Sequence, residues 1–417
     1  MASFMVASCS GAAAQRDRAV APSSPAAPAS TGAGSFGDDL AFLRRHTTPV
    51  VLTAADGRAQ VAVAPEYQGR VMTSTASGLL GPSFGWINRD VIAARKKQPH
   101  MTVFGGEDRF WLGPEGGQYA LYFPPGAPFD FERWQVPEGI DWGGWPITSR
   151  SQRAVRFKKE LALVNHSGTR FRLTVERTVR LLDAASALPA LPTSSSDTPS
   201  AVVYESLNTI TNSGTSAWTP DTGLVSIWIL GMYQPTPETV IVISFRPGPD
   251  SELGPIVNDA YFGKVPESRL RVTARHLFFR GDGTERGKIG IPARRALPAS
   301  GSYDGKRQVL TLVEYTLPDS PGAARYVNSM WEQQKEPYAG DVVNSYNDGP
   351  PAPGKKPLGP FYEIETSSPA AALAPGQSLT HVHRTFHVQG SRAALDALAK
   401  AKLGVGLDVI ETAFDSK

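Results

Sequence analysis

Cysteine is almost absent from this chain of 417 residues, which contains only Cys9. A single cysteine cannot form a disulfide within the chain, and it leaves no Cys-x-x-Cys or Cys/His pattern of the kind that holds zinc. Folding must therefore depend on burial of apolar side chains, which make up 41% of the residues and suffice for a sizeable core.

An excess of charge of one sign is also lacking. The sequence has 42 Lys and Arg against 39 Asp and Glu, a formal net charge of +3. This balance gives no broad basic surface, which excludes nucleic acid or an anionic membrane as a partner held mainly by charge. No stretch reaches the ~20 apolar residues of a membrane-spanning helix.

Charged residues are scarce at 19%, whereas glycine (40) and proline (35) are frequent. This balance favours many turns over long solvated helices and predicts an all-β body. Short segments rich in Val and Thr, bounded by turn residues, predict the strands. The strands expected are Pro49–Thr53, Gln60–Ala64, Arg70–Thr75, Ala154–Asn165, Arg170–Leu182, Ala201–Ile210, Leu224–Met232, Thr239–Phe245, Leu270–Arg280 and Gln308–Leu317.

A few peripheral helices are expected. Asp38–Arg45 is amphipathic, Pro321–Lys335 follows a possible cap at Ser320, and Ser391–Leu403 stops at Gly404. Irregular loops are expected between the elements. They are Asp183–Ser200, Arg246–Asn258 and Glu336–Pro360.

The N-terminal segment resembles an export signal. Val6-Ala7-Ser8-Cys9 is similar to a bacterial lipobox, and the Ala, Pro, Ser and Gly that follow are typical of a flexible tether. We therefore interpret 1–9 as the end of a signal, 10–36 as a tether and 37–417 as one domain. This order predicts lipidation of Cys9 and a lipid-anchored or periplasmic location in a bacterial envelope; a chance cysteine is the alternative.

Alternation in the last two predicted strands gives the main site hypothesis. In the first, Glu363 and Glu365 share one face, and in the second His381 and His383 share one face. If the two segments pair as a hairpin with their apolar sides on the core, the glutamates and histidines must lie together on the opposite face. The simplest register pairs Glu363 with His383 and Glu365 with His381.

This cluster has three interpretations. A glutamate and a histidine form a general base and acid. Alternatively, His381 and His383 with a carboxylate suit a divalent metal. The third interpretation is a solvated sheet face with cross-strand charge pairs.

Polar side chains are also concentrated from Asp341 to Gly349. Polar loops on a rigid β scaffold often carry function. Tyr346, Asn347 and Asp348 are therefore expected to bind a sugar, and an Asx-turn network is the structural alternative.

Four stretches resemble the galactose mutarotase (aldose 1-epimerase-like) superfamily, and the chain is most similar to the uncharacterised bacterial lipoproteins of that group. They are Gly105-Gly106-Glu107-Asp108-Arg109-Phe110-Trp111, the Asn turns at Asn165 and Asn212, Glu363-Ile364-Glu365-Thr366, and Leu373-Ala374-Pro375-Gly376. The resemblance implies a β-supersandwich with a few short peripheral helices and a carbohydrate ligand.

The resemblance also implies site residues. Glu365 matches the mutarotase base best, with Glu363 as the alternative. The histidine that serves mutarotases as acid soon after the second Asn turn is absent, because Trp218 and then Gly223 to Trp228 follow Asn212. His383 or His381 is expected to replace it.

Other residues would complete the binding site. Trp111, Trp228 or Tyr346 would stack on a pyranose, and Arg109 would bind a hydroxyl or carboxylate through its planar fork. The structural alternative pairs Arg109 with Glu107 or Glu115.

The sequence thus predicts acid/base chemistry on a sugar, either epimerisation at the anomeric carbon or cleavage of a glycan. Hydrolysis by two carboxylates and elimination on a uronic acid both remain open. The rival hypothesis is a surface glycan-binding lipoprotein without catalysis. No cofactor is expected, apart from the divalent metal considered above.

Overall fold

A computed structural model describes residues 34–189 and 199–415. The predicted lipobox with Cys9 and most of the predicted tether lie outside the described residues. The domain begins slightly earlier than expected. Ser35 caps helix α1 (Phe36–His46) by accepting a hydrogen bond from the Asp38 backbone NH, so the last two tether residues already belong to the folded part.

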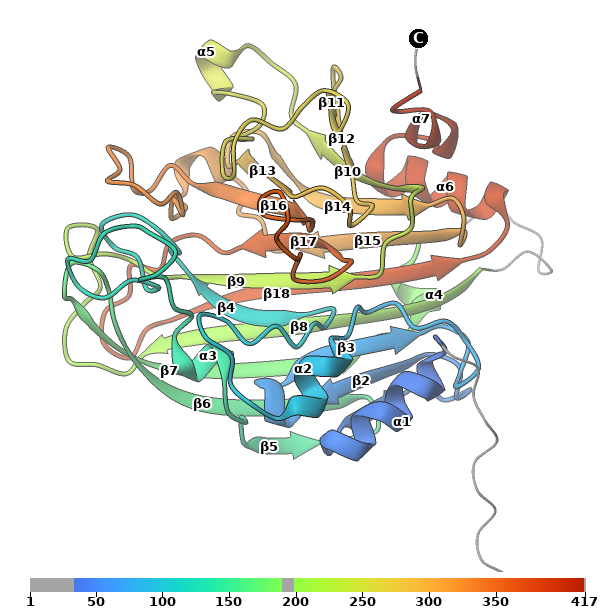
Figure 1. The fold of residues 1–417 in the computed structure, drawn as a ribbon, viewed down its shortest axis with the longest axis horizontal. Helices are drawn as coiled ribbons and strands as arrows, with labels where there is room; N and C mark the ends of the chain where they lie inside the picture. Colours follow the sequence, from blue (N-terminus) through green and yellow to red (C-terminus); the bar gives the residue numbers. More distant parts are fainter. Residues whose placement is uncertain (1–33, 190–198, 416–417) are drawn as a thin grey trace, which may run out of the picture. The chain divides into compact units, whose positions relative to one another are not determined.

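The all-β architecture is confirmed. Most described strands belong to one antiparallel sheet of ten strands, in the order β11-β12-β10-β14-β15-β18-β8-β7-β6-β5 (Figure 1). Its strands are β5 (Ile147–Arg150), β6 (Ala154–Val164), β7 (Arg170–Leu181), β8 (Ser200–Asn212), β10 (Thr239–Phe245), β11 (Leu270–Val272), β12 (His276–Arg280), β14 (Ala296–Asp304), β15 (Val309–Tyr315) and β18 (Ser378–Gln389).

A second layer faces this sheet. It consists of a five-stranded sheet, β13-β16-β17-β9-β4, and a three-stranded sheet, β1-β2-β3, with a bridge between Val71 and Asp108 joining the two. The strands are β1 (Val50–Thr53), β2 (Gln60–Ala64), β3 (Arg70–Thr75), β4 (Arg109–Gly113), β9 (Ser226–Tyr233), β13 (Gly287–Pro292), β16 (Asp341–Asn347) and β17 (Tyr362–Ser367).

Apolar side chains of both layers form the core. Ile243 and Val313 of the ten-stranded sheet pack with Ile289, Val343 and Ile364 of the five-stranded sheet. Close packing of this kind fixes the distance between the layers. The sandwich therefore has one face of each sheet inside and leaves the other face of the five-stranded sheet for loops.

Helices cover the outside of the layers. α6 (Arg392–Leu403) begins at the cap Ser391 and ends at Gly404, as predicted, and its Leu395 and Leu398 pack on Phe386 and Val388 of β18. α1 packs on the three-stranded sheet. The remaining helices are short: η1 (Pro65–Tyr67), α2 (Arg89–Ala94), α3 (Glu138–Asp141), α4 (Ala184–Ala187), α5 (Asp250–Leu253), η3 (Pro321–Ala323) and α7 (Leu407–Glu411).

One predicted helix is wrong. Pro321–Lys335 forms only the single turn η3, and the chain then runs extended and doubles back. The Tyr326 NH donates to the Tyr338 carbonyl and the Asn328 NH donates to the Pro337 carbonyl. These long-range partners satisfy backbone groups that a helix would have paired locally.

Two other element predictions need correction. Glu336–Pro360 is not a continuous loop, because β16 lies inside it between two neighbouring strands. Leu270–Arg280 is two strands, β11 and β12, because the chain reverses where the Thr273 NH donates to the His276 carbonyl.

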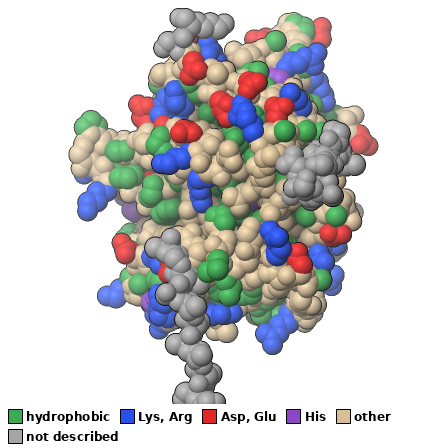
Figure 2. All heavy atoms as spheres, turned by 90° about the vertical axis from the view of Figure 1, so that its right-hand side faces the viewer, with side chains coloured by type: hydrophobic (Ala, Val, Ile, Leu, Met, Phe, Trp, Pro, Cys, Tyr) green, Lys and Arg blue, Asp and Glu red, His purple; other side chains and the backbone are tan. Residues whose placement is uncertain are grey.

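The surface carries charges of both signs. Figure 2 shows one face, on which basic and acidic side chains are interspersed with small green patches. Within the described residues, no helix is both long and apolar enough to cross a membrane.

Candidate functional site

The strands that carry the predicted glutamates and histidines lie in different sheets. β17 pairs with β16 and β9 in the five-stranded sheet, whereas β18 pairs with β15 and β8 in the ten-stranded sheet. The predicted hairpin is therefore wrong. Alternation shows which side chains of a strand share a face, but it does not show which strand lies beside it.

The alternation within β17 is as predicted. Tyr362 and Thr366 point into the sandwich, where Tyr362 Oη bonds Ser302 Oγ of β14 at 2.7 Å. Glu363 and Glu365 point to the other face of the five-stranded sheet.

In β18 the predicted faces are reversed relative to the core. His381 and His383 face into the sandwich, and Phe386 and Val388 lie under α6. The five-stranded sheet thus separates the glutamates from the histidines, and the predicted pairs Glu363–His383 and Glu365–His381 do not form.

The two histidines instead form an inter-sheet contact. Thr366 Oγ1 lies 2.9 Å from His381 Nε2 and 2.9 Å from His383 Nδ1. Burial is the main reason that the pKa of His381 falls to about 3 and the pKa of His383 to about 4. Both rings are therefore neutral at neutral pH. Across residues 34–189 and 199–415, no three His, Cys, Asp or Glu side chains gather as metal ligands.

The third histidine of β18 joins a separate buried network. His387 Nε2 lies 3.1 Å from Glu107 Oε2, and its Nδ1 lies 2.9 Å from Thr311 Oγ1. Glu107 also accepts hydrogen bonds from Tyr204 Oη and from the Ser74 backbone NH and hydroxyl. Glu107 is thus fully used in joining β3, β8 and β18.

Glu365 organises the outer face of the five-stranded sheet. Its Oε2 accepts hydrogen bonds from Lys288 Nζ of β13 and from Trp228 Nε1 of β9, each at 3.0 Å. Its other oxygen, Oε1, is buried without a hydrogen-bond partner. Burial alone would lower the pKa of Lys288, but the carboxylates of Glu365, Glu115 and Glu363 outweigh this and raise it. Lys288 is therefore a cation.

Glu363 makes a second ion pair on the same face. Arg109 Nη2 of β4 donates to Glu363 Oε1 at 3.0 Å, and the guanidinium lies 4.1 Å from the centroid of Trp111. Arg109 thus pairs with neither Glu107 nor Glu115, the partners considered from the sequence. Burial raises the pKa of Glu363, and the nearby Glu365 adds to this, while Arg109 opposes it.

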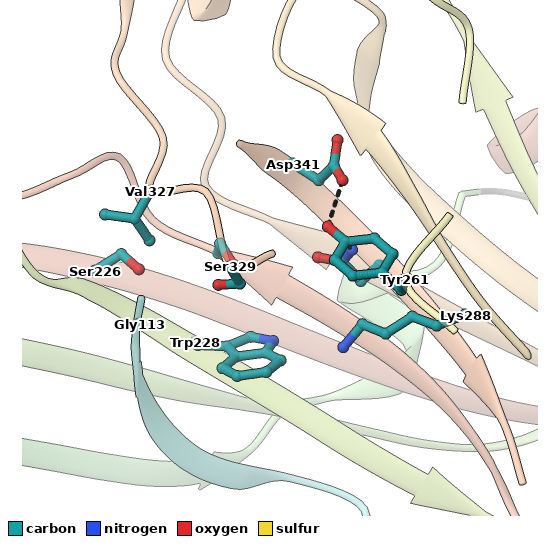
Figure 3. Close-up of a pocket in the computed structure, with 10 residues that line it drawn as sticks. Gly113, Ser226, Trp228, Tyr261, Lys288, Val327, Ser329 and Asp341 are labelled. Atoms are coloured by element: carbon teal, nitrogen blue, oxygen red, sulfur yellow. Dashed lines mark hydrogen bonds between the residues drawn. The ribbon is translucent and has the colours of Figure 1, made fainter. Parts of the chain in front are cut away.

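Two of the partners of Glu365, Lys288 and Trp228, line a hollow on this face (Figure 3). The hollow comprises about 310 Å³ counted with its opening to solvent, and inside it has room for about one water molecule. Its walls come from β4, β9, β13, β16, β17 and two loops. The lining residues are Gly113, Ser226, Trp228, Tyr261, Lys288, Val327, Ser329, Asp341, Asn344 and Ser367.

Asp341 lies opposite Lys288 in this hollow. Its Oδ2 accepts hydrogen bonds from Tyr261 Oη at 2.5 Å and from Asn258 Nδ2 at 3.2 Å. Burial raises the pKa of Asp341 to about 6, although these two bonds and Lys288 oppose the shift. A carboxyl group with this pKa can both release and accept a proton near neutral pH.

A glycine makes room for the Asp341 carboxyl group. A Cβ atom added at Gly290 would lie 2.0 Å from Asp341 Oδ2. The absence of a side chain at this position of β13 is therefore required for the observed position of Asp341.

Two loops cover the hollow. Tyr261 comes from the loop between α5 and β11, and Val327 and Ser329 come from the segment that replaces the predicted helix. A ligand as large as a sugar ring needs these loops to move outwards, because the space present admits only about one water molecule.

The other predicted binding residues are mostly occupied by contacts within the protein. Tyr346 Oη donates to Asp348 Oδ1 at 2.6 Å, and Asp348 Oδ2 accepts from the Gly359 NH at 2.8 Å. Asn347 binds the 282–285 turn, accepting from the Gly283 NH at 2.8 Å. Of the predicted aromatic residues, Trp228 lines the hollow, whereas Trp111 on the neighbouring strand is buried edge-on against Trp228.

The structure adds three residues that the sequence hypothesis did not select: Lys288, Tyr261 and Asp341. A signal exists for Lys288, because Lys288 and Gly290 alternate with Ile289 and Ile291 in the pattern of a strand with one buried face. Asp341 is the first residue of the polar stretch from Asp341 to Gly349, in which the sequence hypothesis selects only Tyr346, Asn347 and Asp348. For Tyr261 we find no local signal.

The chain belongs to the family of unknown function DUF6786, whose sequence model matches residues 34–414. No curated protein matches the chain in sequence.

Several solved structures are similar to the chain. One is a protein of Escherichia coli K12 provisionally named an aldose 1-epimerase, with 13% identity, coverage of 82% of this chain and 99% of that one, and a TM-score of 0.49. Another is a galactose mutarotase-like protein of Lactobacillus casei, with 10% identity, coverage of 82% and 100%, and a TM-score of 0.46. Both are named after the aldose 1-epimerase or galactose mutarotase group that the sequence resembles.

Proposed function

We propose that this protein binds an aldose in the hollow and catalyses epimerisation at its anomeric carbon. One observation carries the proposal: a cation, Lys288, and a carboxyl group, Asp341, face a single hollow beside the indole of Trp228. Acid/base chemistry on a sugar needs a proton donor and a proton acceptor on one ring, and an aromatic face suits a pyranose.

The roles follow from the geometry. Asp341 would take the proton of the anomeric hydroxyl while the bond between the anomeric carbon and the ring oxygen breaks. The ring oxygen would take a proton from Lys288. Rotation of the open aldehyde and reversal of both transfers would give the other anomer.

Glu365 would act as a positioning residue in this reaction. It lines no part of the hollow, but its Oε2 holds both Lys288 and Trp228. The base predicted from the resemblance would thus act through its neighbours, Lys288 and Trp228.

The residues that line the hollow favour epimerisation over glycan cleavage. Hydrolysis of a glycoside generally uses two carboxyl groups, one on each side of the bond. Among the lining residues only Asp341 carries a carboxyl group.

Anomer exchange measured by NMR on a panel of aldoses tests this proposal, with the uncatalysed rate subtracted. We expect Lys288→Met and Asp341→Asn each to reduce the catalysed rate by about 10²-fold or more. Lys400→Met is the matched control, because that lysine is largely exposed on α6, on the outer side of the ten-stranded sheet, and pairs with Asp396. Full activity in both hollow variants would overturn the proposed roles.

The rival function is glycan binding without catalysis. Saturable binding of sugars with no turnover, and with affinity unchanged in Glu365→Gln, would support the rival and contradict the enzyme. Absence of both binding and turnover would contradict both functions.

A further inference from the structure

The cations around the hollow already have carboxylate partners. Lys288 pairs with Glu365 and Arg109 pairs with Glu363, each at 3.0 Å and each largely buried. Among the residues that line the hollow, a ligand with a negative charge would therefore find no unpaired cation, and binding it there would require breaking the pair between Lys288 and Glu365.

Asp341 is in the opposite situation. Its two hydrogen bonds come from neutral donors, Tyr261 and Asn258, and within the described ranges no lysine, arginine or histidine forms an ion pair with it. Lys288 is near enough to lower the pKa of Asp341, but it is paired with Glu365, so the charge of the buried Asp341 carboxylate is only partly balanced, which is costly. A positive charge brought by a ligand would remove that cost.

An independent feature also indicates a ligand in the hollow. Ser226 lines the hollow and is 1% exposed, and its Oγ has no hydrogen-bond partner among the residues that the structure describes. Buried hydroxyl groups in native proteins are normally paired. The free hydroxyl therefore suits a polar group supplied by a bound molecule.

Taking the proposed function as the starting point, we infer that the preferred substrates are amino sugars with a free, protonated amino group. The ammonium would lie between the Asp341 carboxylate and the indole of Trp228, and the Ser226 hydroxyl would bind a hydroxyl of the ring. The face of the indole attracts cations, since Lys288 Nζ lies 4.7 Å from its centroid, and the ion pair with Glu365 offsets the charge of that lysine.

The inference also excludes one class of substrate. The carboxylate of a uronic acid would be repelled by Asp341 and by Glu115, which is close enough to Lys288 and Glu365 to interact with both. The elimination reaction on uronic acids that the sequence left open is therefore disfavoured by the charges.

Calorimetric titration with matched sugars tests the inference on the full chain at about pH 7. The probes are glucosamine and galactosamine, each with its N-acetylated, neutral and uronic acid counterparts. We expect the free amine to bind about tenfold or more tighter than its neutral counterpart, the size of one charge-assisted hydrogen bond, and the uronic acid to bind weakest.

Two variants test whether the charge of Asp341 causes the preference for the amine. Asp341→Asn should abolish the preference for the amine while the neutral sugar still binds. Asp56→Asn, which changes an exposed turn residue, should keep the preference. A preference that survives in Asp341→Asn would overturn the inference.

The pH dependence gives a test that needs no variant. The preference should be lost as the pH falls through about 6, where Asp341 becomes neutral. Lys288 of β13, Tyr261 and Asn258 of the covering loop, Asn344 of β16 and Glu365 of β17 face this carboxyl group or its partners; among them Lys288 keeps its charge over this range.

The outcomes distinguish this inference from the proposed function. Binding of neutral sugars or uronic acids at least as tight as that of the amines would refute the inference alone. Failure of every probe to bind would refute the proposed function as well.

Discussion

Asp341 illustrates, at the scale of single residues, how a site can be costly to the fold. The carboxyl group is buried, its bonds are to neutral donors, and the Cβ-free Gly290 gives it room. Its pKa of about 6 lies above the ordinary value of 3.8. The folded state therefore binds this proton more tightly than the unfolded state does.

We therefore predict that Asp341→Asn stabilises the protein above pH 6. At such pH the wild type keeps a buried charge, and a shift of this size corresponds to about 3 kcal/mol at most. The gain should shrink as the pH falls from about 6 to about 4, because the wild-type carboxyl then becomes neutral. Urea unfolding at several pH values measures it, and equal stability of both proteins at about pH 8 would contradict the prediction.

The sequence predicts that Glu365 belongs to the site, but it does not predict which residues Glu365 contacts. The resemblance pointed to this glutamate, and the structure places it beside Lys288 and Trp228. The expected histidine partners lie beyond the sheet. Partners on other strands depend on long-range pairing, which single-strand patterns do not contain.

At the scale of elements, local sequence patterns predicted the bounds of a strand or helix correctly where those bounds depend on the element's own residues. Gln60–Ala64, Arg70–Thr75 and Thr239–Phe245 match the observed strands, and the β6–β7 hairpin forms. The helix expected at Pro321–Lys335 failed because its backbone found distant partners. β17 and β18 failed as a hairpin because both are central strands with other neighbours.

The contact between β17 and β18 across the sandwich gives a second prediction. In Thr366→Val the side chain keeps its shape, but His381 Nε2 and His383 Nδ1 lose their shared partner in a buried place. We expect the free energy of unfolding to fall by about 2–4 kcal/mol, since two buried polar atoms are left unpaired.

The matched control is Thr209→Val. Its hydroxyl bonds Thr380 between β8 and β18, but the pair is accessible to water. We expect a change within about 0.5 kcal/mol in this variant. Urea unfolding measures both changes. If the free energy of unfolding falls by the same amount in the two variants, the buried hydrogen bonds of Thr366 do not stabilise the fold more than the exposed bond of Thr209, and the prediction is wrong.

At the scale of the whole molecule, the buried histidines make the sandwich sensitive to acid. The pKa values of His381 and His383 in the fold, about 3 and about 4, lie below the ordinary 6.5. The unfolded chain therefore takes up these protons first as the pH falls. Stability from this source should be complete above about pH 6.5 and should decline towards pH 4.

The variant His381→Gln/His383→Asn tests this prediction, because each amide can reach the position of the ring nitrogen that bonds Thr366. Asp341 and Glu363 have raised pKa values in the folded state, so they make the fold more stable as the pH falls and oppose the effect of the histidines. Because both proteins contain these two residues, their effect cancels when the variant is compared with the wild type. The stability difference between about pH 7 and about pH 4.5 should be smaller in the variant by a few kcal/mol. Parallel pH profiles would contradict the prediction.

The predicted anchor concerns the whole molecule as well. We propose that the protein is lipid-modified at Cys9 and held at a bacterial membrane. Metabolic labelling with a fatty acid in a bacterial host should mark the wild type and leave Cys9→Ser unlabelled, and only the variant should leave the membrane fraction. Labelling of the variant would contradict the assignment.

The inward-facing histidines of β18 also bear on how related sequences can change. Thr366 in one layer bonds one ring nitrogen of each of two imidazoles in the other layer, across the interior. A substitution on one side would be tolerated only with compensation on the other. Within the family, we therefore expect these three positions to covary as a set, with an apolar residue at the threonine accompanied by loss of the histidines.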